Sequence, residues 1–452
     1  MKKTTVALLL ASLACAPAMA AKNIIFFLGD GMGPTTVTAA RIFKYKEEGL
    51  LHFERMERSA RLKTYSADAQ TTDSAPSMGS YMTGIKINNA VISMADAKAM
   101  SPKKDANGNA TIDRCLPGNG RAAPTILELA KAAGKSVGAV TTTEMTHATP
   151  ASTFAHTCHR DAAYAIATQI VPGGAGYNAA LGDGVDVLMG GGRNLFTPFD
   201  AARNPKGRAD GRDLLAEMSA KGYAVGANRS DMLAARPGRK FIGIYSDSSH
   251  LDYDQVRRPA QPSLSEMASK AIDLLAPNRK GFFLMVEGGK IDHGLHGSNA
   301  RRALEETVAF DDAIKAVLDK MRVLDPGLRN TLLVVTADHD HTLVINGGSK
   351  RGNPILDIAR GEDGQPLRDA DGKTYTTLVF GNGPNRKDVR VDVDSTAAQA
   401  ADYQQETGMR LAVETHGGGD VKLFATGAGS EVFKGTMENT KVFDLMKAAF
   451  GF

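Results

Sequence analysis

Five short segments of the chain are apolar at nearly every position, and longer amphipathic segments separate them. Strands of a parallel sheet show this pattern, because helices cover both of their faces. The pattern predicts an α/β fold in which a large, mostly parallel central sheet is flanked by helices on both faces. The expected strands are residues 24–28, 136–140, 185–189, 282–286 and 332–335.

A crossover helix is expected between the last two of these strands. Apolar residues recur there at near-helical spacing, with charged residues between them, at Leu304, Val308, Ile314, Val317 and Met321. This amphipathic pattern is typical of a helix that packs on a sheet and connects two parallel strands.

The chain has 452 residues, and no internal repeat or Pro- or Ser-rich linker divides it. We therefore expect a single domain over residues 21–452, although a chain of this length could hold more than one. Two polar stretches rich in Gly, Asp, Asn and Lys, near residues 98–119 and 349–394, are expected to be surface insertions.

The N-terminus has the three parts of a signal peptide. Lys2 and Lys3 precede an apolar run at residues 6–10, and the Ala-Met-Ala sequence at 18–20 has the form of a cleavage site. A membrane-spanning helix needs about 20 apolar residues, so this run is too short for a stable membrane span. We expect residues 1–20 to be a signal peptide and the protein to be exported, to the periplasm or to the medium.

The charge of the chain argues against one class of partner, nucleic acid. The formal net charge is +4 and there is no long basic run, so nucleic acid is not an expected partner.

Cleavage of the signal peptide would remove Cys15 and leave Cys115 and Cys158 in a compartment that permits disulfides. The two cysteines either form a disulfide or remain free thiols, because the bond depends on a Cα separation that the sequence does not contain.

Acidic residues follow three of the expected strands. Asp30 comes after residues 24–28, Glu287 after 282–286 and Asp338 after 332–335. A single acidic residue after a strand is most often a helix cap or a turn former. Three acidic residues in the same topological position indicate a binding site instead. The strand ends on one side of a parallel sheet converge on the crevice where such sheets bind ligands.

Histidines accompany these acidic residues in three clusters. Asp292 and His296 stand four residues apart, Asp338 is followed by His339, and His416 lies in a Gly-rich loop. Each cluster alone could be a surface histidine beside a solvated acid. Three together in a chain with 10 histidines favour metal coordination, and imidazole with carboxylate but no thiolate favours catalytic zinc.

The number of candidate ligands is too large for one ion. Two zinc ions could share six residues, namely Asp30, Asp292, His296, Asp338, His339 and His416. Glu287, with Asp30 and a hydroxyl group, would offer the oxygen ligands that Mg²⁺ prefers.

Ser74 is the candidate nucleophile. It follows Asp73 in a segment that looks like a turn opening a helix, where Asp and Ser are also common as simple N-caps. A helix N-terminus presents free N–H groups to a phosphate, and a nearby zinc would lower the pKa of the hydroxyl group.

These motifs together resemble the alkaline phosphatase family across most of the chain after residue 20. The matching segments include residues 30–33 with 38–41, the Asp73-Ser74-Ala75 triplet, and residues 143–150 and 156–160. The segments around Glu287, Asp338 and His416 complete the set in the order of the family. The resemblance implies a phosphomonoesterase with two Zn²⁺, one Mg²⁺ and a phosphoserine intermediate, acting as a homodimer on small phosphate monoesters.

The resemblance also implies a role for each residue. Zinc that binds the attacking water and the leaving group would be held by Asp292, His296 and His416. Zinc that activates Ser74 would be held by Asp30, Asp338 and His339. Asp30 would extend to a magnesium ion held with Thr149 and Glu287, and Arg160 would clamp the phosphate.

Three further residues would support the site without binding metal, namely Asp73, His147 and His293. Histidine at the last two positions resembles the branch of the family shared by animal enzymes and some marine bacterial enzymes. A fourth, calcium-like site of the animal relatives is not assigned, because residues 245–250 do not clearly match its pattern.

Other functions stay open. Residues 74–78 nearly match the sulfatase pattern of Ser or Cys, any residue, Pro, any residue, Arg, but Met78 stands in place of the arginine. The alternatives are therefore a related phosphodiesterase or sulfatase, or a non-catalytic protein that binds metal or phosphate.

Overall fold

The computed structural model describes residues 20–100, 115–247 and 249–452. All but the last residue of the predicted signal peptide, and most of the insertion predicted near residues 98–119, lie outside the described residues. Within the described part of the chain, no helix is both long enough and apolar enough to cross a membrane.

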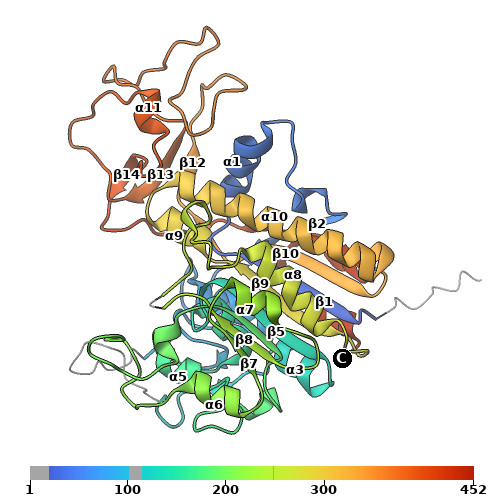
Figure 1. The fold of residues 1–452 in the computed structure, drawn as a ribbon. Coiled ribbons are helices and arrows are strands. Elements are labelled where there is room, and N and C mark those ends of the chain that lie inside the picture. Colours follow the sequence, from blue (N-terminus) through green and yellow to red (C-terminus); the bar gives the residue numbers. More distant parts are fainter. Residues whose placement is uncertain (1–19, 101–114, 248) are drawn as a thin grey trace, which may run out of the picture.

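A sheet of ten strands runs through the centre of the described structure (Figure 1). Most neighbouring strands are parallel, and the antiparallel pairs lie at β16, which pairs with both β10 and β2. In spatial order the strands are β17 (Gly435–Glu438), β2 (Arg58–Lys63), β16 (Val421–Gly427), β10 (Thr331–Ala337), β1 (Asn23–Gly29), β9 (Phe282–Gly288), β5 (Ser136–Glu144), β6 (Val187–Gly191), β8 (Phe241–Ile244) and β7 (Ala224–Gly226).

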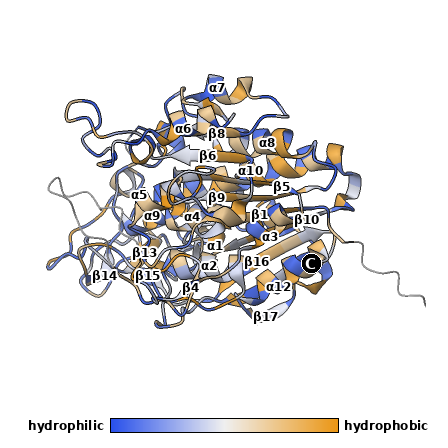
Figure 2. Cartoon of the chain, turned by 90° about the horizontal axis from the view of Figure 1, so that it is seen from below, coloured by the Kyte–Doolittle hydropathy of each residue, from blue (hydrophilic) through white to orange (hydrophobic). Residues whose placement is uncertain are grey.

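The five predicted strands are confirmed as the middle of this sheet. They correspond to β1, β5, β6, β9 and β10, and nearly all of their residues are buried. Burial on both faces is the reason that their sequences are apolar without alternation. Figure 2 shows the hydrophobic residues gathered along these central strands.

Helices cover both faces of the sheet, as the pattern predicts. Helices α8 and α10 pack on one face, and α3, α4 and α12 pack on the other. The predicted crossover helix is confirmed as α10. The helices of the described residues are α1 (Pro34–Tyr45), α2 (Ser74–Thr83), α3 (Ile126–Ala132), α4 (Ala148–Phe154), α5 (Ala163–Thr168), α6 (Leu214–Ala220), α7 (Arg229–Ala234), α8 (Leu264–Leu275), α9 (Lys290–His296), α10 (Ala300–Leu324), α11 (Ser395–Ala398) and α12 (Lys441–Phe450).

The polar stretch at residues 349–394 lies outside the ten-stranded sheet. It contains β13 (Leu378–Gly383), which forms a small separate sheet with β12 (Leu343–Ile345) and β14 (Thr407–Arg410). In Figure 1 this sheet and α11 stand beyond the end of α10.

A disulfide joins Cys115 to Cys158, with 5.7 Å between the Cα atoms. Of the two alternatives that the sequence leaves open, the structure therefore selects the bond. Cys158 lies two residues before Arg160, so the cross-link anchors the segment that carries this arginine.

Candidate active site

The three acidic residues predicted at strand ends come together. Asp30 follows β1 and Asp338 follows β10, as predicted. Glu287 is the penultimate residue of β9, because this strand continues two residues beyond the predicted end at 286. The strands are parallel neighbours, with Gly29 opposite Ala337 and Leu28 opposite Glu287. All three carboxyl groups are completely buried.

One group of donor atoms comes from α9 and from β15 (His416–Gly417). Asp292 Oδ1 lies 3.3 Å from His296 Nε2 and 3.5 Å from His416 Nε2, and the two imidazole nitrogens are 3.1 Å apart. Ligands of a tetrahedral zinc ion with bonds of about 2.0–2.1 Å lie about 3.3 Å from one another. These three side chains, which the resemblance assigns to one ion, are therefore spaced closely enough to share a tetrahedral metal ion.

A second group forms where β1 and β10 end. His339 Nε2 lies 3.4 Å from Asp30 Oδ1 and 3.4 Å from Asp338 Oδ2. Ser74 Oγ lies 3.3 Å from His339 Nε2 and 3.4 Å from Asp30 Oδ1. The hydroxyl group therefore occupies the place of a further ligand beside the three that the sequence predicts.

The first turn of α2 holds Ser74 against the sheet. Asp73 caps the helix by accepting the N–H of Ala75 at 2.7 Å, as expected of an N-cap. One turn further on, Ser77 Oγ donates to the carbonyl of Asp338 at 2.7 Å. The helix is thus tied to the strand end that carries the second group of donors.

A third group contains oxygen atoms that lack partners. Asp30 Oδ2, Glu287 Oε1 and Thr149 Oγ1 are buried and have no hydrogen-bond partner among the described residues. Buried polar atoms without partners are costly, so such a group indicates a ligand. His147 lies close enough to Asp30 and Glu287 to share an ion with them.

Arg160 is held from two sides. Its Nη1 donates to Asp73 Oδ1 and its Nη2 to His147 Nε2, both at 3.1 Å. The ring of His293 lies 5.8 Å from that of His147. The structure therefore brings together all of the predicted site residues, including the three that were expected to support the site.

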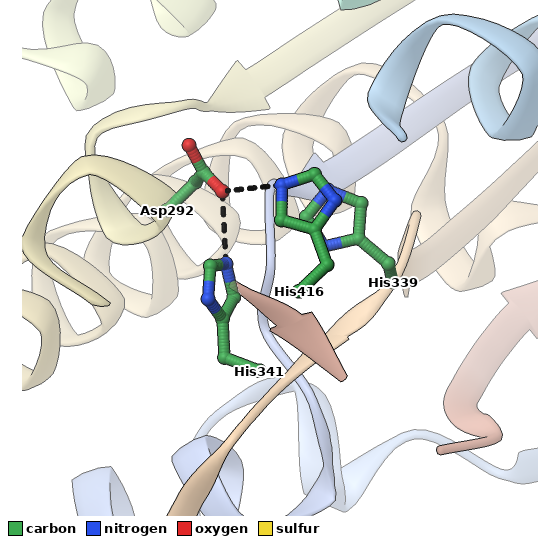
Figure 3. Close-up of side chains that lie close together, drawn as sticks. All are labelled: Asp292, His339, His341 and His416. Carbon is green, nitrogen blue, oxygen red and sulfur yellow. Dashed lines mark hydrogen bonds and ion pairs between the residues drawn. The ribbon is translucent and has the colours of Figure 1, made fainter. Parts of the chain in front are cut away.

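His341 and Glu414 are site residues that sequence reasoning missed. His341 Nε2 lies 2.8 Å from Asp292 Oδ1 (Figure 3). His341 Nδ1 lies 2.6 Å from Glu414 Oε2. The Asp-His-Asp-His run at residues 338–341 was the available signal. The sequence alone does not show which histidine of this run would bind metal and which would orient a ligand. That distinction depends on the neighbours of each ring, which only the structure shows.

Burial explains why the ionised forms of these carboxyl groups need a compensating positive charge or a hydrogen bond. Burial, and then the charge of Asp338, raise the pKa of Asp30 well above its usual range. Burial also raises the pKa of Glu287 to about 7. Burial would raise the pKa of Asp292 too, but the hydrogen bond with His341 holds it well below its usual range. Bound cations would stabilise the ionised forms of all three.

Known proteins resemble this chain over most of its length. The family model described as alkaline phosphatase matches residues 21–452. The tissue-nonspecific isozyme of Gallus gallus is 36% identical, over 93% of this chain and 83% of its own. Alkaline phosphatase of Gadus morhua is also 36% identical, over 93% of this chain and 90% of its own.

Solved structures agree with the sequence relatives. A cold-active alkaline phosphatase from Shewanella sp. is 27% identical, with a TM-score of 0.67, over 95% of this chain and 99% of its own. Thermus thermophilus alkaline phosphatase, at 24% identity and a TM-score of 0.69, has the same fold over 98% of this chain and 96% of its own. The chain therefore belongs to the alkaline phosphatase family and is a metal-dependent phosphatase.

Proposed function

We propose that the protein hydrolyses phosphate monoesters at alkaline pH through a phosphoserine formed on Ser74. The observation that carries the proposal is the position of Ser74 Oγ, 3.3 Å from His339 Nε2 and 3.4 Å from Asp30 Oδ1. A serine that only capped α2 would have no reason to lie among metal-ligating atoms, and Asp73 already provides the cap.

The donor sets support two zinc ions and one magnesium ion. Asp292, His296 and His416 would hold one zinc. Asp30, Asp338 and His339 would hold the other, beside Ser74. The oxygen-rich third group of Asp30, Thr149 and Glu287 suits Mg²⁺. When bound, these ions would supply positive charge that favours the ionised hydroxyl of Ser74 and offsets the charge on the phosphoryl oxygens.

The reaction would proceed in two displacements. Ser74 Oγ forms a bond to phosphorus while the bond to the ester oxygen breaks, and the alcohol leaves with a proton. Water then cleaves the phosphoserine, which returns a proton to Ser74 Oγ and releases phosphate. Each displacement inverts phosphorus, so the net result is retention.

Arg160 would bind the phosphoryl group during both displacements. A guanidinium group can donate two parallel hydrogen bonds to two phosphoryl oxygens. Asp73 and His147 accept from separate nitrogens of Arg160, so they fix the plane of this fork before the substrate arrives. Prior orientation of this kind lowers the entropic cost of the bound transition state.

Export and assembly belong to the same proposal. The N-terminal pattern of residues 1–20 supports a signal peptide, and a disulfide between Cys115 and Cys158 suits an oxidising compartment such as the periplasm or the medium. We also propose a single domain over residues 21–452 and, by analogy with the family, a homodimer.

An assay with three substrates tests the activity. We expect a nitrophenyl phosphate monoester to be hydrolysed at least about tenfold faster than the corresponding diester or sulfate. A chelator should abolish the activity, and zinc with magnesium should restore it. Preference for the diester or the sulfate would favour the related enzymes instead, and binding without hydrolysis of any substrate would indicate a non-catalytic protein.

A further inference from the structure

A third histidine, His250, lies beside His147 and His293, two of the residues expected to support the site without binding metal. The ring of His250 lies 4.3 Å from the ring of His293 and 5.5 Å from the ring of His147. All contacts among these three rings are edge-on, with angles of 66° to 89° between the ring planes. We call His147, His250 and His293 the imidazole cluster.

The backbone holds His250 firmly in this cluster. The N–H of Glu144, the last residue of β5, donates to His250 Nδ1 at 3.1 Å, and the N–H of Leu251 donates to the carbonyl of Thr142 at 2.9 Å. On the other side, the backbone of residues 249–250 packs directly against Gly191 of β6. A side chain at position 191 would not fit, because its Cβ would lie 2.3 Å from the carbonyl oxygen of Ser249. Strands β5 and β6 therefore fix the position of the ring.

The cluster ends at Arg160. His147 Nε2 accepts from Nη2 of this arginine at 3.1 Å, while Asp73 Oδ1 accepts from Nη1. A hydrogen bond to an imidazole is directional, so the plane of the His147 ring determines where Nη2 points. That ring packs edge-on against both other histidines of the cluster.

We propose that His250 is a positioning residue for phosphate binding by Arg160. It is held by β5 and fills the space beside His147 and His293, and so keeps the His147 ring in the orientation that Arg160 requires. Removal of the ring would leave a gap into which His147 or His293 could rotate. The inference rests on the proposed role of Arg160 as the phosphate clamp.

Inhibition by inorganic phosphate, measured with saturating zinc and magnesium, tests the inference. We expect His250→Ala to raise the inhibition constant by about 3- to 10-fold, the size of coupling usual between neighbouring residues. In an Arg160→Ala background, the same substitution should leave the constant unchanged, because the group that His250 positions is absent.

Two further variants separate the ring from its anchor. His250→Phe keeps a ring of similar shape but no acceptor for the N–H of Glu144, so phosphate inhibition should stay near that of the parent while the melting temperature falls. His250→Asn keeps an acceptor but not the ring, so it should weaken phosphate inhibition as His250→Ala does. The Asn variant also serves if His250→Ala does not fold.

A control variant accounts for general destabilisation. His52 contacts Asp311, outside the imidazole cluster, so His52→Ala should lower the melting temperature without changing phosphate inhibition. Unchanged inhibition in both His250→Ala and His250→Asn would overturn the inference, as would equal effects of His250→Ala with and without Arg160. If Arg160→Ala itself leaves phosphate inhibition unchanged, the clamp role in the proposed function fails instead.

Discussion

Asp30 contributes to two candidate cation sites with its two oxygens. Oδ1 lies 3.4 Å from His339 Nε2, whereas Oδ2 is buried and has no hydrogen-bond partner in the described part of the chain. Burial raises the pKa of this carboxyl group well above its usual range. A cation beside each oxygen would lower this pKa, which supports the proposal that Asp30 takes part in both the zinc site beside Ser74 and the magnesium site.

At the residue scale, loss of a proposed metal ligand should reduce turnover more than loss of the proposed phosphate clamp, Arg160. Arg160→Ala removes charge-assisted hydrogen bonds, and a net loss of about 1.5–3 kcal/mol corresponds to a decrease of about 10- to 150-fold in phosphate affinity. His416→Ala removes a donor from the group proposed to hold the first zinc ion and should reduce turnover by at least about tenfold more than Arg160→Ala does.

Steady-state kinetics with phosphate as inhibitor would measure both effects, and the metal content of each variant would separate them. The Arg160→Ala protein should keep the parental metal content, whereas the His416→Ala protein should lose zinc. An Arg160→Ala protein inhibited by phosphate as strongly as the parent would contradict the clamp.

At the scale of elements, strand ends and helix starts determine which side chains meet. Helix α3 stabilises the segment that leads to Arg160 from outside the site. Glu128 completes the capping box of this helix with Thr125. Its Oε1 also lies 2.8 Å from His156 Nε2. Although burial lowers the pKa of His156, the contact with Glu128 raises it above its ordinary value. The segment that leads to Arg160 is thus joined to α3 by an ion pair.

The pH dependence of stability should reveal this pair. Because the pKa of His156 is higher in the folded state, its contribution is fully present below the unfolded value of about 6.5 and is lost as pH rises through the folded value. Urea unfolding of the metal-loaded protein should therefore show a decrease in stability above about pH 6.5 that is smaller in His156→Gln. Parallel pH profiles for the two proteins would refute the ion pair.

Some elements could be predicted from sequence and others could not, for physical reasons. The central strands are buried on both faces, so their patterns are unambiguous. Strand β2 has only two buried residues, Ala60 and Leu62, among exposed polar and charged residues, and this alternation is too short to distinguish it from a loop. Likewise, the donor residues stand in recognisable motifs, whereas His250 and Glu414 join the site only through contacts with residues distant in sequence.

At the scale of the whole molecule, the metal site lies where the strands that build the core converge. Strands β1, β9 and β10 are adjacent, and the carboxyl groups of Asp30, Glu287 and Asp338 are buried beside their ends. Without cations, these like charges repel one another in a region of low dielectric constant. Metal binding should therefore stabilise the entire fold and not only the site.

Thermal unfolding with and without a chelator tests this coupling. A ligand present at about 1,000 times its dissociation constant stabilises a protein by about 4 kcal/mol, so removal of several ions should lower the melting temperature by many degrees. Zinc with magnesium should restore it. A melting temperature that does not respond to the chelator, in protein shown to have lost its metal, would contradict the coupling.

The most direct test of the whole account is the detection of a phosphoryl group on Ser74. The protein would be mixed with a phosphate monoester, quenched in acid and examined by peptide mass spectrometry, with Ser80→Ala as a control from the same helix and Ser74→Ala as the test variant. We predict phosphoserine at position 74 in the parent and in Ser80→Ala, and loss of most turnover in a folded, metal-loaded Ser74→Ala protein. Undiminished turnover in that variant, or a turning-over parent that never carries phosphate on Ser74, would contradict the covalent mechanism.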